Sequence, residues 1–385
     1  MAGSKATSSG LRQAAGTLLV VGLGGTELTG LERAWLRLVR PGGIILFKRN
    51  ITDAPQTRVL LDEATGLAAP HAARHVDIEG GTVNRLRDAL APIPSAQAVG
   101  AAMRNQRKPA LARKHGDLIG RATRAFGFNT ALAPVLDLGL PESEKVLGSR
   151  CASSIPAEIV DYAHEFLAGL AAVGVTGCGK HFPGLGAGTF DSHFETPRIR
   201  RGKQLWAGDI APYRALARTL PMVMTNHAAY PDQPAGDVPA SASPFWITTV
   251  LRKRLGFAGL IVSDDLEMGG ILKFLPADEA AVAAVRAGSD LLLICHSAEL
   301  ILRAYEALIH AGERSSAFRT LLLARARTTE RQRARLYSGG VGRSPTPVQL
   351  ARLAEQIHAF TATINAATAQ SETVAPRAIS PAEIV

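Results

Sequence analysis

Residues 175–197 read Val-Thr-Gly-Cys-Gly-Lys-His-Phe-Pro-Gly-Leu-Gly-Ala-Gly-Thr-Phe-Asp-Ser-His-Phe-Glu-Thr-Pro, an apolar run that leads into a polar, glycine-rich loop. The segment 174–177 is short, β-branched and bounded by glycines, which predicts a strand with both faces covered. Lys180, His181, Asp191 and His193 are expected to follow in one loop. Its five glycines between 177 and 188 supply backbone freedom, and such loops serve function more often than packing.

The triplet Asp191-Ser-His193 is the sharpest chemical feature of this loop. A carboxylate two positions from an imidazole can accept a hydrogen bond from one ring nitrogen and leave the other free for proton transfer. A turn capped by Asp191, with His193 in solvent, fits the triplet alone equally well.

Outward from this stretch, strand-like and helix-like segments alternate along most of the chain. Strands are expected at 18–22, 43–47, 75–77, 130–137, 174–177, 221–225, 259–263 and 290–294, and most are followed by a helical pattern. Eight such units favour a single (β/α)8 barrel of the TIM type over the alternative, an open doubly wound sheet.

Polar side chains follow the carboxyl ends of the predicted strands: Asp77, Lys180, His181, His227 and Asp264. A barrel of this class gathers its catalytic groups on that face. The sequence therefore predicts one site built from several strand ends.

The ends of the chain differ in composition from the barrel. We expect a flexible N-terminus over 1–15, a catalytic barrel over 16–338 and a C-terminal extension over 339–385. A short helix is expected at 348–360, and the Ala/Thr/Ser/Pro-rich remainder is expected to be mostly disordered. The early apolar run 14–25 is broken by glycines and too short to span a bilayer, so no membrane insertion is expected.

Cysteines and charge bound the partners. Cys151, Cys178 and Cys295 form no CxxC or Cys/His spacing, which indicates reduced thiols in a cytoplasmic protein and no metal site. The formal net charge of +10 is partly concentrated in arginines over 314–335. No aromatic residues alternate with them as base-stacking platforms, so a solvated helix face is expected, and no nucleic-acid partner.

Lys180-His-Phe-Pro-Gly184, followed by Asp191-Ser-His193 and Thr196-Pro197, resembles the central motif of glycoside hydrolase family 3, in particular its bacterial β-N-acetylglucosaminidases. The resemblance extends from about residue 43 to about residue 336. The substrate-binding residues that it implies are Asp77, Arg85, Arg150, Lys180 and His181.

Retaining cleavage of a glycosidic bond needs a carboxylate on one side of the anomeric carbon and a proton donor on the other. Asp264, in Val262-Ser-Asp-Asp-Leu266, is the best nucleophile candidate, while Asp265 is expected to orient it or to cap the next helix. The resemblance places the nucleophile on Asp264 and the acid/base on His193 with Asp191. It further implies N-acetylglucosamine-containing muropeptides as substrate in the cytoplasm. We expect a monomer that uses no cofactor.

The sequence departs from the family pattern next to the site. Leu185 follows Pro-Gly where relatives commonly have His, Thr82 follows Glu-Gly-Gly where they often have Arg, and Ser149-Arg-Cys-Ala152 replaces a more usual Asp-Arg-Ser-Phe. Four alternatives therefore stay open: a β-glucosidase; a phosphorylase, since a neutral imidazole base does not repel phosphate; a Schiff-base lyase using Lys180; and a sugar-binding protein without activity.

Overall fold

A closed ring of parallel strands forms the centre of the molecule. The computed structural model describes residues 2–188 and 196–372. Its main sheet has the strand order β7-β6-β3-β2-β1-β11-β10-β9-β8, and every pair in it is parallel. β7 (Thr176–Gly177) and β8 (Gly179–Phe182) stand at the two ends of this order and are separated only by Cys178. They are two parts of one strand, so the sheet closes on itself, and the predicted (β/α)8 barrel is confirmed.

The remaining barrel strands are short and buried. They are β1 (Leu19–Gly22), β2 (Gly43–Leu46), β3 (Ala73–Val76), β6 (Thr130–Ala131), β9 (Met222–Thr225), β10 (Leu260–Asp265) and β11 (Leu291–Ile294). Apolar runs of this kind suit parallel strands that have helices outside and a packed interior. The barrel interior is filled by Val20, Ile45, Leu132, Cys178, Met222, Met224, Leu260, Val262, Leu291, Leu293 and Cys295.

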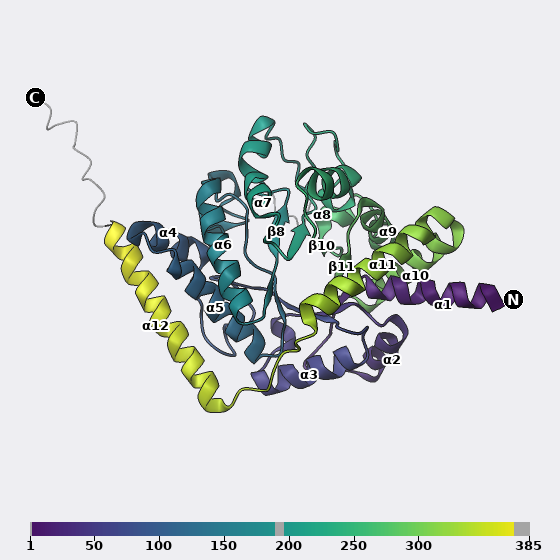
Figure 1. Ribbon diagram of the computed structural model, residues 1–385, viewed down its shortest axis with the longest axis horizontal. Coiled ribbons are helices and arrows are strands. Elements are labelled where there is room, and N and C mark those ends of the chain that lie inside the picture. Colours follow the sequence, from purple (N-terminus) through teal and green to yellow (C-terminus); the bar gives the residue numbers. More distant parts are fainter. Residues whose placement is uncertain (1, 189–195, 373–385) are drawn as a thin grey trace, which may run out of the picture.

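Helices surround this ring (Figure 1). They are α2 (Gly30–Val39), α3 (Ala54–Gly66), α4 (Ala96–Gln106), α5 (Ala110–Ala125), α6 (Pro156–Ala172), α7 (Ala211–Leu216), α8 (Gly269–Leu272), α9 (Ala277–Ala287) and α10 (Ala298–Arg314), with π-helical segments at Leu205–Asp209 and Phe245–Arg254. Local signals set their ends. Thr29 and Glu32 form a capping box at the start of α2, and Asp53 caps α3.

The strand that carries the central motif is longer than predicted. Lys180 and His181 lie within β8 and not in the loop that follows it. Lys180 donates its backbone N–H to Pro134 O at 3.2 Å, and its carbonyl accepts from Leu136 N at 2.6 Å. The neighbouring strands therefore extend this segment despite its glycines. Conversely, β6 ends at Ala131, short of the predicted Asp137, and the chain regains only an isolated bridge at Val135.

The amino end of the barrel is closed by α11 (Ser316–Tyr337). Arg333 on this helix is fully buried and donates from Nη1 to Gly42 O at 2.6 Å, while Arg325 pairs with the buried Asp290 at 3.0 Å. The expectation of a wholly solvated basic face is therefore wrong, because one side of α11 packs against the strand ends. Tyr337, near its end, accepts a hydrogen bond from Thr130 Oγ1 at 3.0 Å.

Both terminal segments form helices that pack on the barrel. α1 (Ala2–Thr17) contacts α10 and α11 and buries Leu11, Ala14 and Ala15, so the expectation of a flexible segment over 1–15 is wrong for residues 11–15.

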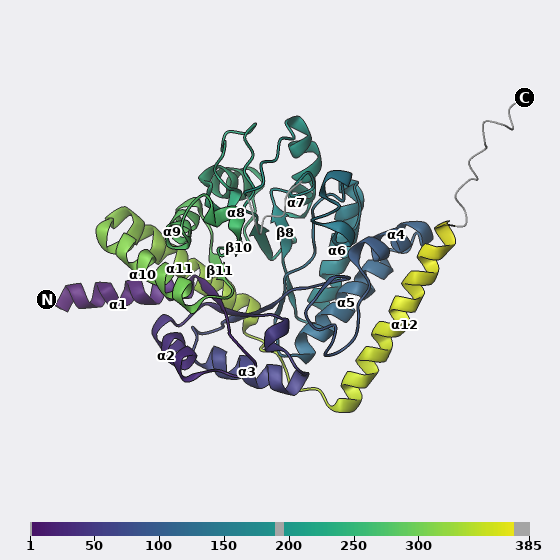
Figure 2. The ribbon, with the colours of Figure 1, turned by 180° about the vertical axis from the view of Figure 1, so that it is seen from behind.

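α12 (Pro347–Glu372) continues past the predicted end of its helix at residue 360 and lies along α4 and α5, as the two opposite views show (Figures 1 and 2). Its buried residues recur every three or four positions: Leu353, Ile357, Phe360, Ile364 and Ala367. This face corrects the expectation of disorder for 361–372, and residues 373–385 lie outside the described part of the chain. Among the described residues, no helix combines the length and the apolar character needed to cross a membrane.

Candidate active site

A cavity of about 520 Å³ opens at the carboxyl ends of the barrel strands. Six predicted site residues line it: Asp77, Arg85, Arg150, Lys180, His181 and Asp264. They come from five different strand-to-helix connections or strand ends, which is how this fold assembles a site. Asp191 and His193, the two other predicted site residues, lie outside the described residues.

Five of the charged groups in this cavity form one chain of alternating sign. Lys180 Nζ lies 2.9 Å from Asp77 Oδ1 and 2.6 Å from Glu79 Oε1. Arg150 makes a two-pronged contact with Glu79, with Nε 2.8 Å from Oε2 and Nη2 2.9 Å from Oε1. Arg85 Nη2 is 3.9 Å from Asp77 Oδ2 and completes the chain. Each buried charge thus has a partner of opposite sign.

A short hairpin after β3 positions two members of this chain. Glu79 is in β4 (Ile78–Gly80), and Arg85 directly follows β5 (Val83–Asn84). The turn between them has Gly80 at φ 91° and Gly81 at φ 58°, and a Cβ on Gly80 would lie 2.1 Å from Pro94 O. Only glycine fits that close approach in that conformation.

The alternating charges hold one another ionised. Burial alone raises the pKa of Glu79, but Arg150 and Lys180 outweigh it and bring that pKa below its ordinary value. The pKa of Asp77 is likewise lowered, because Lys180 and Arg85 outweigh its burial. Burial lowers the pKa of Lys180, yet Asp77 and Glu79 together raise it above the ordinary value. A Schiff-base lysine needs a lowered pKa, so this environment argues against a lyase.

A buried carboxylate orients His181. Asp137 Oδ2 lies 2.6 Å from His181 Nδ1, and Asp137 Oδ1 accepts from Leu185 N at 2.7 Å. On the other side of the ring, Nε2 is 3.3 Å from Arg150 Nη2, which can only donate. His181 therefore carries its proton on Nδ1 and is fixed at both nitrogens. The sequence placed Asp137 at a strand end without giving it a role.

Asp264 and Asp265 stand at the end of β10, on the wall of the cavity. Asp264 Oδ1 accepts from Asp265 N at 2.9 Å, and Asp265 Oδ1 accepts from Glu267 N at 3.1 Å, so Asp265 closes the turn that follows the strand. Burial, reinforced by the Glu267 carboxylate, raises the pKa of Asp265 to about 7. The two neighbouring carboxyl groups thus differ in environment.

His227, which the strand-end pattern also singled out, supports this turn from behind and does not line the cavity. Its Nε2 lies 2.9 Å from the carbonyl oxygen of Asp265, and its Nδ1 lies 2.7 Å from Ser241 Oγ. Burial lowers the pKa of His227, so the neutral ring donates from Nε2.

Asp265, Glu267 and His296 are the described residues whose potential ligand atoms lie close enough together to hold a cation, within 4.8 Å of one another. Glu267 already accepts from the backbone N–H groups of Cys295, His296 and Ser297 through its two oxygens. This carboxylate therefore fastens the start of α10 beside the cavity, and its oxygens are not free for a metal.

An aromatic and cationic rim borders the cavity. Phe47 stacks on His296 with 5.2 Å between ring centroids, and the guanidinium of Arg49 lies 4.9 Å from the Phe47 ring centroid. Arg85 approaches the same ring at 5.8 Å. Rings with cations nearby offer flat apolar area and hydrogen-bond donors together. The rim was not predicted, although Lys48-Arg-Asn50 was noted at a strand end.

The departures from the family pattern differ in position. Leu185 is buried and lines the cavity, so it can affect what the cavity accepts. Thr82 is exposed at the hairpin turn and does not line the cavity. The described ends of the central loop both lie near the site, because Leu185 N is bound by Asp137, and Thr196 Oγ1 donates to Gly270 O at 2.6 Å in the segment after Asp264.

Comparisons with known proteins agree with this geometry. Residues 11–322 match the model of the glycosyl hydrolase family 3 N-terminal domain. A protein named β-hexosaminidase from Alkalilimnicola ehrlichii is 39% identical over 287 residues, which cover 74% of this chain and 82% of that protein. A β-hexosaminidase from Idiomarina loihiensis is 35% identical over 78% of this chain and 90% of that protein.

Solved structures of similar fold include a glycoside hydrolase family 3 β-N-acetylglucosaminidase from Paenibacillus sp., with a TM-score of 0.81 and 31% identity over 91% of this chain and 68% of that chain. NagZ from Neisseria gonorrhoeae has a TM-score of 0.68 and 29% identity over 81% of this chain and 97% of that one. On the extent of the family match and the identity to these relatives, the chain belongs to glycosyl hydrolase family 3.

Proposed function

We propose that this protein, a β-N-acetylhexosaminidase, removes terminal β-linked N-acetylglucosamine with retention of configuration. The observation that carries the proposal is the single cavity at the barrel's carboxyl end, where Asp264 faces the same space as the chain of charges from Arg85 to Arg150. A carboxylate and a set of directional, charge-assisted donors around one cavity suit a sugar ring.

In this mechanism Asp264 attacks the anomeric carbon, and the bond to the leaving oxygen breaks. A glycosyl-enzyme ester forms on Asp264 while His193, paired with Asp191, gives its proton to the leaving oxygen. His193 then takes a proton from water, and the resulting hydroxide replaces Asp264 on the anomeric carbon with a second inversion. The anchoring of the loop on both sides of the cavity, at Leu185 and Thr196, supports this role for residues between them.

The ionised chain binds the sugar hydroxyls. Asp77 accepts hydrogen bonds from hydroxyls, while Arg85, Arg150 and Lys180 donate to them, and His181 presents a fixed ring edge. Because each of these groups is already paired and oriented, little conformational entropy is lost when the sugar arrives.

We further propose that the natural substrate is a muropeptide fragment of the cell wall, met in the cytoplasm by a monomeric enzyme. This step rests on the family resemblance and on relatives named β-hexosaminidase and NagZ. Mass spectrometry of purified muropeptides after incubation checks it: loss of one N-acetylhexosamine is expected, and intact muropeptides would contradict it. Sedimentation velocity checks the monomer.

The direct test of the activity compares an aryl β-N-acetylglucosaminide with the matching aryl β-glucoside. Fast release from the first and slow release from the second are expected; the reverse preference would make the protein a β-glucosidase. No turnover of either would favour a sugar-binding protein. Proton NMR of the first product should show the β-anomer. Repeating the reaction in phosphate distinguishes hydrolysis from phosphorolysis, because only the latter releases a sugar 1-phosphate.

A further inference from the structure

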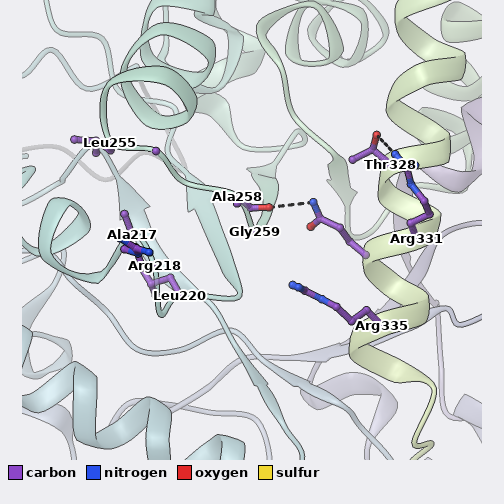
Figure 3. Close-up of a pocket in the computed structure, with 11 residues that line it drawn as sticks. Ala217, Arg218, Leu220, Leu255, Ala258, Gly259, Thr328, Arg331 and Arg335 are labelled. Carbon is purple, nitrogen blue, oxygen red and sulfur yellow. Dashed lines mark hydrogen bonds between the residues drawn. The ribbon is translucent and has the colours of Figure 1, made fainter.

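A second, larger hollow lies at the opposite end of the barrel (Figure 3). It has a volume of about 830 Å³ and lies where α11 crosses the amino ends of β9 and β10. Its walls include Arg218 and Leu220 before β9, Gly259 before β10, and Thr328, Arg331 and Arg335 on α11. We refer to this hollow as the floor groove. It shares no lining residue with the catalytic cavity.

The floor groove is cationic and has no counter-charge of its own. Three of its lining residues are arginines, and none is Asp or Glu. Within the described ranges, Arg218, Arg331 and Arg335 make no ion pair, and Arg331 reaches only Thr328 Oγ1, at 3.4 Å. On the inner side of the same helix, Arg325 is paired with Asp290. The unpaired charge is thus concentrated at the groove.

The placement of the three guanidinium groups suits an extended anion. Arg331 and Arg335 stand one turn apart on α11, and Arg335 reaches from the helix toward the strand ends (Figure 3). Arg218 lies on the opposite wall. Guanidinium groups bind phosphate in two-pronged fashion, and like charges gathered around one hollow repel until an anion enters.

The size and lining of the groove indicate what kind of anion it takes. Its volume is within the range of small-molecule sites. No aromatic side chain lines it, so it offers no platform on which a nucleobase could stack. Two walls of positive charge suit phosphate groups at both ends of a small molecule better than a single one.

We propose that the floor groove binds a small molecule that carries two or more phosphate groups. The site is separate from catalysis, since (β/α)8 enzymes work at the other end of the barrel. The likeness to hexosaminidases assigns nothing to this end of the molecule, and the inference does not depend on the proposed glycosidase activity.

Isothermal titration calorimetry of the full chain with pyrophosphate, at physiological salt, tests the proposal. Saturable binding at one site is expected, with inorganic phosphate binding at least about tenfold more weakly. The double variant Arg331→Gln/Arg335→Gln should lose at least about tenfold in pyrophosphate affinity, and Arg218→Gln should lose less. The matched control is Arg303→Gln, an exposed arginine that is paired with Asp278 at 3.0 Å and lies outside the groove. It should bind as the wild type does.

Four results would overturn the proposal. They are the absence of saturable binding, equal loss in the control, displacement of pyrophosphate by N-acetylglucosamine, and tighter binding of single-stranded RNA than of pyrophosphate. Displacement by the sugar would place the anion at the catalytic cavity, and tighter RNA binding would make the groove part of a nucleic-acid surface. Thermal melting of each variant shows whether it is folded, and a rise in wild-type Tm with pyrophosphate gives an independent reading of binding.

Discussion

The two ends of the barrel treat positive charge in opposite ways. At the carboxyl end, Lys180 and Arg150 are buried, and each is bound to a carboxylate at hydrogen-bond distance. At the amino end, Arg331 and Arg335 are exposed and unpaired within the described part of the chain. Paired charges fix a geometry before a neutral sugar arrives, whereas unpaired charges attract a ligand that brings its own charge.

The difference also predicts how each end responds to mutation. Removing one member of a buried pair leaves the other charge without a partner in a low-dielectric setting, which is strongly destabilising. Removing an exposed arginine relieves repulsion and costs little stability. Substitutions at the carboxyl end should therefore change activity, folding or both, and substitutions at the floor groove should change anion binding alone.

The largest effect is expected for Asp264→Asn. An amide oxygen cannot form the glycosyl ester, so kcat/KM for an aryl β-N-acetylglucosaminide should fall by at least about 10³-fold. Circular dichroism should show an unchanged fold, because Asp264 is only partly buried and Asn keeps an acceptor for Asp265 N. His193→Ala should fall by a comparable order, and an added small anion should restore part of the loss only in Asp264→Asn. Turnover by Asp264→Asn within tenfold of wild type would remove Asp264 from the mechanism.

Glu79→Gln sharpens the contrast in charge pairing. It leaves Lys180 and Arg150 with less compensation, and we expect the free energy of unfolding to fall by about 3–5 kcal/mol in urea denaturation. The matched control is Asp278→Asn, which removes the carboxylate of an exposed pair and should cost less than about 1 kcal/mol. Equal losses in the two variants would show that the buried chain of charges has no special weight.

Asp137→Asn tests the positioning of His181. The substitution can retain an acceptor for Leu185 N, but it weakens the contact with His181 Nδ1. A ring displaced by a fraction of an ångström should lower kcat/KM by about 10²-fold, and mainly through KM if His181 only binds sugar. An unchanged KM with a lowered kcat would instead give His181 a part in the chemical step.

The pH dependence of stability separates the two carboxyl groups at the end of β10. The folded-state pKa of Asp265 is about 7, above its unfolded value near 4. Its ionised form therefore destabilises the fold fully above pH 7, and this cost disappears as pH falls through 7 to 4. Asp265→Asn removes the cost, so its stability relative to wild type should rise between pH 4 and pH 8, by roughly 2 kcal/mol or more. A difference that does not vary with pH would contradict the raised pKa.

Much of the fold could be predicted because parallel barrel strands are short, apolar and regularly spaced. The errors arose where local composition and tertiary packing disagree. Glycines on both sides of Cys178 predicted that the strand ends, but pairing with Pro134 and Val223 extends it through Phe182. The polar composition of 361–372 predicted disorder, although the apolar spacing from Leu353 to Ala367 already indicated a helix face.

The site was predictable only in part, for a similar reason. Residues that directly follow a strand, such as Asp77 and Asp264, are visible in the sequence because the fold puts those positions on one face. Glu79 was missed, because its role depends on a hairpin that turns it back toward Lys180 and Arg150. Asp137 was seen but left without a role, since its contact with His181 spans 44 positions of the chain.

The central claim is that Asp264 becomes covalently bound to the sugar. Mass spectrometry of peptides from enzyme quenched during turnover of a slowly hydrolysed aryl β-N-acetylglucosaminide measures this directly. The account predicts an N-acetylhexosamine adduct on the peptide that contains Asp264 and β-anomeric product. An adduct on another carboxylate, or α-anomeric product with no adduct, would contradict it.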